Sequence, residues 1–303
     1  MADTKNKILG NKIDFMLFIS VTNANCNGDP LNGNRPRTNY DGYGEISDVC
    51  IKRKIRNRMQ DLGKEIFVQS EDRAKDKAAS LNARFEAFKK TLNKNISTDK
   101  LTEEACKKWL DVRTFGQLFA YKSSSGGEKG ISMGVRGPVS IHLANSIDSV
   151  EISSMQITKS VNGTDKESAD NTSSKMSSDR MGMKHFVRYG LYQIKGSINV
   201  QLAEKTGFTE KDAETLKLCL KTLFINDESA ARPAGSMEVN KIYWWKHNCK
   251  TGQYSTAEVH RSVAVKRKNK EKAPTSFDDY EINVKKLKGL AMEEIEDSDC
   301  NKE

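Results

Sequence analysis

The chain has 303 residues, of which 36% are hydrophobic, and it carries 50 Lys and Arg against 41 Asp and Glu. This is enough apolar material to bury a core in one elaborated domain or two modest ones, which excludes a disordered protein. The net charge of +9 favours an acidic partner, with nucleic acid the usual candidate, although other basic proteins share this balance.

Cysteine spacing and the amino end exclude two further classes. The six cysteines are scattered without a paired Cys-x-x-Cys spacing, so the sequence predicts reduced thiols, no structural zinc site and no cofactor. The apolar run at 15–19 is far too short for a signal peptide or a membrane span. We expect a cytoplasmic protein that does not use a membrane.

The first predicted element is a strand over residues 13–21. Apolar residues occupy nearly every position of it, which predicts burial on both faces. A Gly/Asn/Pro-rich loop, NANCNGDPLNGNRPR, follows at 23–37 and carries Arg35 and Arg37. Its Asn-Gly pairs can form tight turns that expose backbone N–H groups, so the loop can approach an anion closely.

A helix is predicted to begin at Ser47 or Asp48, directly after this loop. Four apolar residues at helical spacing form its buried stripe: Ile51, Ile55, Met59 and Leu62. Five cations fall between Lys52 and Arg58, beside a helix N-terminus that attracts phosphate. We interpret loop and helix as one groove for a phosphate backbone, lined by Arg37, Lys52 and Arg56. The alternative is a solvated basic face on an ordinary amphipathic helix.

Residues 65–111 change character, because Lys, Asp, Glu and Ala become frequent while helical spacing persists. Apolar residues at 81, 85, 88 and 92, and again at 101, 105 and 109, predict two helices. We interpret this stretch as a helical insertion, since the strand pattern resumes beyond it. The Ser/Gly-rich stretch at 123–130 predicts a flexible loop without a phosphate-binding motif, so a nucleotide hydrolase is not supported.

Strand patterns alternate with a polar segment in the next part of the chain. Val139, Ile141 and Leu143 form the apolar side of one strand. Residues 151–185 are polar and Ser-rich, so they cannot bury enough surface to order themselves, and we expect a flexible protrusion. Residues 192–202 alternate apolar and polar side chains, which predicts a long strand.

A helix and a strand complete the predicted core. Thr209 and Asp212 form a capping-box-like start of a helix with one apolar stripe. The strand follows at 239–246, where the adjacent aromatic residues 243–245 point to opposite faces, so at least one belongs to the core. The resulting order of strand, helix, strand, strand, helix, strand is that of a split βαβ fold of the RRM type.

Several of these motifs together resemble one family. NGDPLNGNRPR followed by DVCIKRKIRNR is similar to the signature of the backbone subunit of the type I-C CRISPR surveillance complex Cascade. This is a repeat-associated (RAMP) family of guide-RNA-binding proteins with an RRM-like core. Further stretches agree in the same order over about residues 13–247: DVRTFG at 111–116, VRGPVSI at 135–141, MGMKHFVRYGLY at 181–192 and DESAAR at 227–232.

The resemblance implies a protein without catalysis. Copies of the chain, with other Cascade subunits, would line up along a CRISPR guide RNA as a helical filament and leave its bases free to pair with target DNA. A thumb-like protrusion of each copy would fold over the RNA toward its neighbour, and the resemblance assigns Met176 and Met181 to this thumb. By motif match it assigns contacts with the RNA to Asn27, Arg35, Arg37, Lys52, Lys54, Arg56, Arg136, Lys184, His185 and Arg232.

The predicted fold class is therefore α+β: a modified RRM or ferredoxin-like palm with a helical insertion and a flexible thumb-like protrusion. The predicted boundaries are a palm at 1–64, 112–150 and 186–250, the insertion at 65–111, the protrusion at 151–185 and a charged extension at 251–303. The extension carries basic KRKNKEK at 266–272 and acidic EEIEDSD at 293–299, and we expect it to be flexible and outside the family core. The base-stacking consensus of a standard RRM is absent.

Two other functions stay open at this point. Some relatives in the broader superfamily cut RNA, so the chain is a candidate endoribonuclease with His142, His185, Asp29 and Asp48, although their spacing matches no known catalytic constellation. The other is a stand-alone RRM-like RNA-binding protein that forms no filament. Because a few phosphate contacts per copy bind weakly and with strong salt dependence, we expect tight binding only in an assembly.

Overall fold

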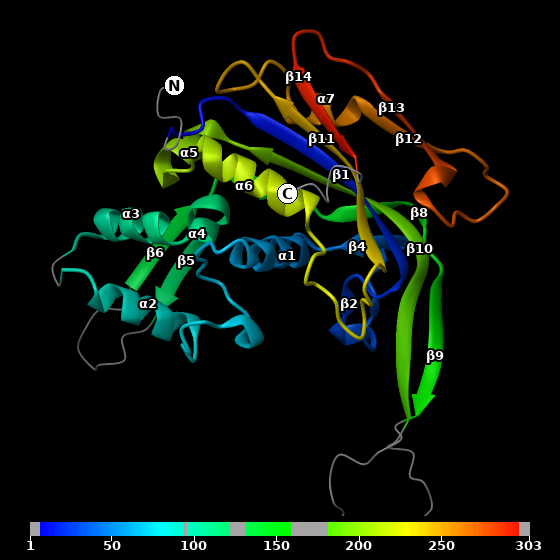
Figure 1. Cartoon of the computed structure of the whole chain (residues 1–303), viewed down its shortest axis with the longest axis horizontal. Helices are drawn as coiled ribbons and strands as arrows, with labels where there is room; N and C mark the ends of the chain where they lie inside the picture. Colours follow the sequence, from blue (N-terminus) through cyan, green and yellow to red (C-terminus); the bar gives the residue numbers. More distant parts are fainter. Residues whose placement is uncertain (1–6, 94–95, 122–130, 159–180, 297–303) are drawn as a thin grey trace, which may run out of the picture.

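The computed structural model describes residues 7–93, 96–121, 131–158 and 181–296. Its centre is one antiparallel sheet of eight strands (Figure 1). These strands are β1 (Ile13–Ala24), β4 (Tyr43–Ile46), β7 (Val139–Ile141), β8 (Ala144–Ser149), β9 (Ile152–Thr158), β10 (Met181–Ile198), β11 (Met237–Lys246) and β14 (Ala291–Glu296). Six of them follow the order β14-β11-β1-β10-β8-β4, and β7 and β9 pair with other parts of β10.

β1 lies in the middle of the sheet, between β10 and β11. Every residue from Ile13 to Val21 is buried, as the run of apolar residues predicted. Phe15 and Leu17 belong to the hydrophobic cluster on one face, and Met16 and Phe18 to the cluster on the other. The prediction of a strand buried on both faces is therefore confirmed.

Three helices cover one face of the sheet: α1 (Asp48–Asp61), α5 (Val200–Thr206) and α6 (Glu210–Lys221). The predicted start of α1 is confirmed, because the Ser47 hydroxyl caps it by accepting a hydrogen bond from the Cys50 N–H at 3.3 Å. The capping box of Thr209 and Asp212 at the start of α6 is also present. None of the described helices has the length and apolar character that crossing a bilayer requires.

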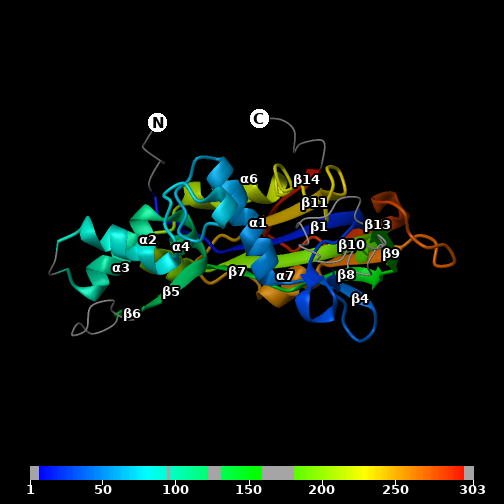
Figure 2. The same cartoon turned by 90° about the horizontal axis from the view of Figure 1, so that it is seen from below.

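The C-terminal part of the chain covers the opposite face, where Figure 2 shows α7 across the sheet from α6. Its elements are α7 (Thr256–Arg261), β12 (Val263–Arg267), the 3-10 helix η5 (Phe277–Asp279) and β13 (Tyr280–Val284). Val259, Val263 and Tyr280 pack there against Tyr243 and Trp245 of β11. Both of these aromatic residues and Trp244 are buried, so the prediction that at least one belongs to the core is confirmed.

The expectation of a flexible C-terminal extension is wrong over residues 251–296. β14 pairs with β11 from Lys241–Glu296 to Lys246–Ala291 and closes one edge of the sheet. Glu294 and Glu296 accept ion pairs from Lys241 at 2.7 and 3.0 Å, so part of the acidic run has a structural partner. The basic run at 266–272 covers the end of β12 and the start of its connection to β13. Charge alone did not reveal the buried apolar residues beside and within the two charged runs, which include Val263, Tyr280 and Ile295.

The predicted strand at 192–202 also needs a correction, because β10 ends at Ile198. Asn199 caps α5 by accepting a hydrogen bond from the Leu202 N–H at 2.8 Å. Val200 and Leu202 are therefore helical residues, with Val200 buried beside Ala203. Two alternating positions fit a strand and the start of a helix equally well, and the Asn199 cap decides between them.

Both ends of the segment predicted as a flexible protrusion are ordered. β9 and the first part of β10 form a two-stranded ribbon, paired from Met181–Thr158 to Val187–Ile152, which projects from the sheet (Figure 1). Backbone hydrogen bonds along the ribbon order these residues, although their polar composition predicted no ordered structure. Residues 159–180, including Met176, lie outside the described residues.

The helical insertion has a hydrophobic core of its own. It contains the two predicted helices, α2 (Leu81–Lys90) and α3 (Thr98–Lys108), followed by α4 (Leu110–Phe115). A two-stranded sheet of β5 (Gly116–Tyr121) and β6 (Ile131–Arg136) packs against these helices. Phe119 and Met133 of this sheet pack with Phe67, Phe85 and Trp109, so β5 and β6 belong to the insertion by packing, although sequence analysis placed them in the palm.

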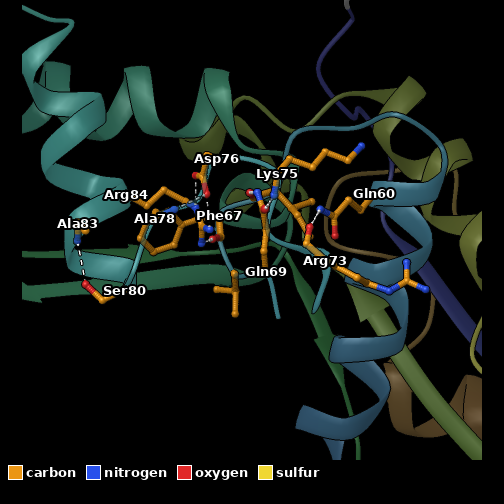
Figure 3. A network of polar contacts seen from close by, with 12 residues as sticks. Gln60, Phe67, Gln69, Arg73, Lys75, Asp76, Ala78, Ser80, Ala83 and Arg84 are labelled. Carbon is orange, nitrogen blue, oxygen red and sulfur yellow. Dashed lines mark hydrogen bonds and ion pairs between the residues drawn. The ribbon is translucent and has the colours of Figure 1, made fainter. Parts of the chain in front are cut away.

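Polar contacts hold the connection between α1 and α2, which includes the 3-10 helix η3 (Glu71–Arg73), against its surroundings (Figure 3). Arg73 forms an ion pair with Asp61 at 2.6 Å, and its carbonyl accepts a hydrogen bond from the Gln60 amide at 2.7 Å. Arg84 of α2 pairs with Asp76 and donates to the Phe67 carbonyl at 2.7 Å. The insertion is thereby fixed to α1.

Candidate nucleic-acid interface

The Gly/Asn/Pro-rich loop contains β2 (Gly28–Asp29), the 3-10 helix η2 (Pro30–Asn32) and β3 (Arg35–Pro36). Gly33 has φ +58°, the left-handed conformation expected of the second Asn-Gly pair. The first pair makes no such turn, since Gly28 lies in β2 opposite Pro36. The Asn34 N–H donates to the Asp29 carbonyl at 2.8 Å, which closes the loop on itself.

Asn27 joins this loop to the start of α1. Its side-chain oxygen accepts hydrogen bonds from the N–H and the hydroxyl of Ser47, both at 2.9 Å. Its carbonyl accepts from the Arg37 N–H at 3.0 Å. Several N–H groups that sequence analysis expected to be available to an anion, including those of Asn34 and Arg37, therefore donate hydrogen bonds within the protein. Asn27 acts as a brace between loop and helix.

Three of the five cations of α1 contact side chains that lie at least 55 residues away in the sequence. The buried Lys54 ammonium forms an ion pair with Asp227 and lies 5.4 Å from the centre of the Phe224 ring. Arg56 pairs with Asp111 at 2.9 Å, and Arg58 donates to the Thr222 hydroxyl at 2.7 Å. These cations hold α1 against α4 and the end of α6.

Lys54 belongs to a group of side chains that comes from three separate segments. Arg232 shares the same Asp227 oxygen with Lys54, at 3.2 Å. Burial raises the pKa of the Cys50 thiol, while the nearby charges of Lys54, Arg232 and Arg37 act in the opposite direction. We refer to the Asp227 cluster, which consists of Arg37, Cys50, Lys54, Asp227 and Arg232. Hydrogen bonds place the loop beside these side chains, since the Asn25 N–H donates to the Ala231 carbonyl and the Cys50 thiol donates to the Cys26 carbonyl at 3.7 Å. The cluster therefore brings together the loop, α1 and the DESAAR segment.

The single groove expected from Arg37, Lys52 and Arg56 is not formed. Arg37 pairs with Asp29 at 3.4 Å, Lys52 with Asp48 at 2.8 Å and Arg56 with the buried Asp111. The reason is helical geometry: two residues along α1 turn a side chain by about 200°, so position 52 points away from the flank of Cys50 and Lys54 that faces the loop. Sequence analysis counted the cations of α1 correctly, but it assigned the groove to the flank of Lys52 and Arg56, which faces away from the loop.

Arg136 lies at the opposite end of β1 from the Asp227 cluster. It ends β6 just before Val139, which pairs with Ile198, itself opposite Ile13 at the start of β1. The cluster instead adjoins the other end, where the Asn25 N–H donates to the Ala231 carbonyl at 2.9 Å. β1 has 12 residues, so the two places are separated by roughly 36 Å at about 3.3 Å per residue.

Arg136 lines a cavity of about 860 Å³ together with Lys12, Lys250 and several hydroxyl side chains. Behind it, the buried Asp14 accepts hydrogen bonds from Thr256 and His247, each at 2.9 Å, and pairs with Lys12 at 3.2 Å. Burial by itself raises the pKa of Asp14, and these partners more than offset it, so the pKa lies below its ordinary value. Arg136 forms no ion pair with any other described residue.

The ribbon presents Lys184 and His185 on its two faces, since successive strand residues point in opposite directions. His185 is hydrogen-bonded through its Nδ1 to the Ser154 hydroxyl at 2.8 Å. Large apolar side chains are exposed on both faces: Met155 at 48%, Ile157 at 47%, Met181 at 55% and Met183 at 56%. Sequence analysis singled out only Met181 of these four. The alternation of the others became visible once the ribbon's register was known.

The four groups proposed for a ribonuclease are not brought together. Asp29 and Asp48 each pair with a neighbouring cation, as described above. The His142 N–H donates to the Lys195 carbonyl, ten residues along β10 from His185, which is about 33 Å along a strand. Across the described part of the chain, no three His, Cys, Asp or Glu side chains are grouped so that they could hold a metal ion.

Comparison with known proteins assigns a family. Residues 11–285 match the family model of CRISPR-associated protein Cas7, and the chain belongs to that family. The match extends beyond residue 247, where the motif resemblance ended, and includes the basic run at 266–272 that the sequence had placed outside the family core.

A curated relative and two solved structures are similar to the chain. The CRISPR-associated protein Cas7 of Haloferax volcanii is 25% identical over 237 residues, covering 70% of this chain and 64% of the relative, so the chain spans just under two thirds of that relative. A chain of a CRISPR RNA-guided surveillance complex, pre-nicking, has a TM-score of 0.47 at 14% identity, covering 80% of this chain and 83% of that one. A chain of a CRISPR RNA-guided surveillance complex has a TM-score of 0.40 at 16% identity, covering 77% and 68%.

Proposed function

We propose that the chain is the non-catalytic backbone subunit of a CRISPR RNA-guided surveillance complex, of type I-C. It binds guide RNA, further copies of itself and other subunits, and presents the guide for pairing with target DNA. The observation that carries the proposal is the meeting of three motif-bearing segments in the Asp227 cluster, in a chain of the Cas7 family. Family membership alone would not say which surface faces the RNA.

The palm of this proposal is RRM-like. The strands β11, β1, β10 and β7 stand side by side in that order, and α1 and α6 share one face, which is the arrangement of a split βαβ fold. The loop and the Asp227 cluster then lie at one end of the palm. The ribbon of β9 and β10 serves as the base of the thumb, with Lys184, His185 and Met181 near its outer end.

Within this surface the cations differ in how freely they can meet a phosphate. Arg35 forms no ion pair with any other described residue, and Arg37 and Arg232 are partly exposed beside a single carboxylate each. These three are the proposed direct contacts at the Ala24 end of β1. Asn27, Lys54 and Arg56 act by holding the loop and α1 in place, and Lys52 contributes only a screened surface charge.

The test uses the purified full chain and a single-stranded RNA of guide length. A backbone subunit forms a ladder of oligomers on this RNA, visible by mass measurement, and leaves labelled RNA intact with and without divalent metal. A stand-alone RNA-binding protein gives one complex of fixed size, and a ribonuclease gives shortened products; either result contradicts the proposal. Copurification followed by sequencing of the bound RNA tests the type I-C assignment through the repeat that the guides carry.

A further inference from the structure

An aromatic side chain stands out from the surface beside the cationic loop. Tyr40 is 109% exposed, more than the reference value for a free residue, and no hydrogen bond or ring contact joins its side chain to another described residue. Buried aromatic side chains remove about 150–250 Å² from water, so leaving one wholly in solvent forgoes a large stabilisation. A single exposed tyrosine needs no functional explanation by itself. In this case, the way its turn is held and the neighbouring cations point to a function.

The turn that carries Tyr40 is held in one conformation. The Asn39 side-chain oxygen accepts hydrogen bonds from the N–H groups of Asp41 at 3.0 Å and Tyr43 at 2.9 Å. The Gly42 carbonyl accepts from the Val150 N–H at 2.9 Å, which ties the turn to the end of β8. The ring is therefore presented outward by a braced turn, and it does not hang from a loose loop.

The same turn is connected to the cations of the loop. The Arg37 carbonyl accepts a hydrogen bond from the Glu45 N–H at 2.9 Å, so Arg37 begins the short hairpin whose tip is Tyr40. Because Val150 leads directly into β9, the turn lies between the Arg35 and Arg37 loop and the base of the ribbon. A nucleic-acid strand that passes from the loop to the ribbon passes this ring.

We propose that Tyr40 is a stacking platform for one unpaired nucleobase of the single-stranded RNA whose phosphates meet Arg35 and Arg37. The inference rests on the proposed function and adds to it a contact with a base, where the motif-based reading assigned contacts with the backbone alone. Stacking of a base on an aromatic side chain is worth about 1–3 kcal/mol and tolerates any base, because every base has a π-face. Such a contact fits a protein that must accept guides of any sequence.

The experiment separates base from backbone. Binding of the full chain to a guide-length RNA is compared with binding to a stabilised abasic strand of the same length, which keeps the phosphates and lacks the bases. Tyr40→Ala weakens binding to the RNA about tenfold and leaves binding to the abasic strand unchanged. Tyr40→Phe keeps the ring and the affinity, whereas Tyr40→Leu keeps apolar area and loses the affinity.

Two matched variants complete the design. Leu31→Ala removes another fully exposed apolar side chain of the same loop region, 99% exposed, and leaves both affinities unchanged. Arg37→Ala weakens binding to both strands, because it acts on phosphate. Since Tyr40 supports no other described side chain, thermal unfolding of the Tyr40 variants matches that of the unchanged protein.

Three outcomes overturn the stacking proposal and leave the proposed function intact. Tyr40→Ala has no effect on either strand, or it weakens both equally, or it reduces self-association in the absence of RNA, which makes Tyr40 a contact between copies. If the unchanged protein binds neither strand at any protein concentration that permits assembly, the proposed function itself fails. The measurements with Arg37→Ala and with the abasic strand distinguish a failure of the stacking proposal from a failure of the proposed function.

Discussion

Arg232 and Arg136, at opposite ends of β1, are held in different ways. At the Ala24 end, Lys54 and Arg232 share Asp227 on a braced surface beside the loop. At the Ile13 end, Arg136 stands without an ion pair among the described residues, on the rim of an open cavity. The comparison teaches that a count of cations in a sequence overstates the charge available to a ligand, because carboxylates inside the protein claim part of it.

The same difference appears within α1 itself. Lys52 lies on the surface with a neighbour one turn away, while Arg56, four residues later, reaches the buried Asp111 of α4. Lys52 is therefore replaceable, whereas Arg56 holds the insertion to α1 and so to the sheet. The following predictions test how sharply structural cations and RNA-contacting cations divide.

The largest expected effect is on stability. Arg56→Ala leaves Asp111, which is fully buried, with only the N–H groups of Phe67 and Val68 as partners, at 2.7 and 3.1 Å. Because breaking a buried ion pair strands a charge, we expect the free energy of unfolding to fall by about 3 kcal/mol in urea titrations. Lys52→Ala, the control on the same flank, changes it by less than about 0.5 kcal/mol. An Arg56→Ala variant of normal stability with weakened RNA binding would make Arg56 a direct contact.

Asp227→Asn gives the next largest effect, and its sign is informative. The substitution raises the net charge by one, which by long-range attraction alone would tighten RNA binding. We expect instead a loss of about tenfold in affinity, because Lys54 and Arg232 lose the carboxylate that orients them. Binding titrations at two salt concentrations measure both affinity and salt dependence.

Two further variants serve as controls for this prediction. Asp48→Asn raises the charge equally at the start of α1 and leaves RNA affinity unchanged or slightly higher, since its partner Lys52 lies on the flank away from the loop. Asp227→Glu restores the carboxylate and part of the affinity. Tighter binding by Asp227→Asn would show that the Asp227 cluster needs no positioning carboxylate.

A smaller effect compares the two ends directly. Arg37→Ala and Arg136→Ala are each expected to lower by about one the slope of log affinity against log salt concentration on guide-length RNA, since each removes one phosphate contact. An RNA of about four nucleotides is too short to reach both ends of β1. On this RNA we expect the effects of the two substitutions on affinity to be independent of each other. Lys90→Ala, an exposed cation of α2, controls for net charge. An unchanged slope for Arg136→Ala would confine RNA to the Ala24 end.

The smallest effect concerns the acid stability of the insertion. The hydrogen bonds and charge of Arg84 lower the pKa of Asp76 from 3.8 to about 2. A carboxyl whose pKa is lower in the folded state stabilises the fold above about pH 4, and this contribution is lost as the pH falls toward 2. Asp76→Asn should therefore flatten the acid limb of stability between these values in unfolding curves. An unchanged acid limb would mean that solvent screens the pair, because the Asp76 side chain is 41% exposed.

Local patterns in the sequence determined the elements whose signals are local. The apolar run of β1, the Ser47 cap of α1 and the capping box of α6 were all predicted, because periodicity and capping depend on residues a few positions apart. The ordered series of motifs also predicted the family that the comparison then assigned.

Only the tertiary structure decided which cations are free. Lys54 meets Asp227 across 173 residues and Arg56 meets Asp111 across 55, and no local pattern announces such a partner. The same holds for the C-terminal strand, since β14 becomes the edge of the sheet by pairing with β11. Sequence by itself determined what kinds of side chain this protein has and which local structures they form. Folding decided which charges neutralise one another, because electrostatic partners are chosen by distance in space.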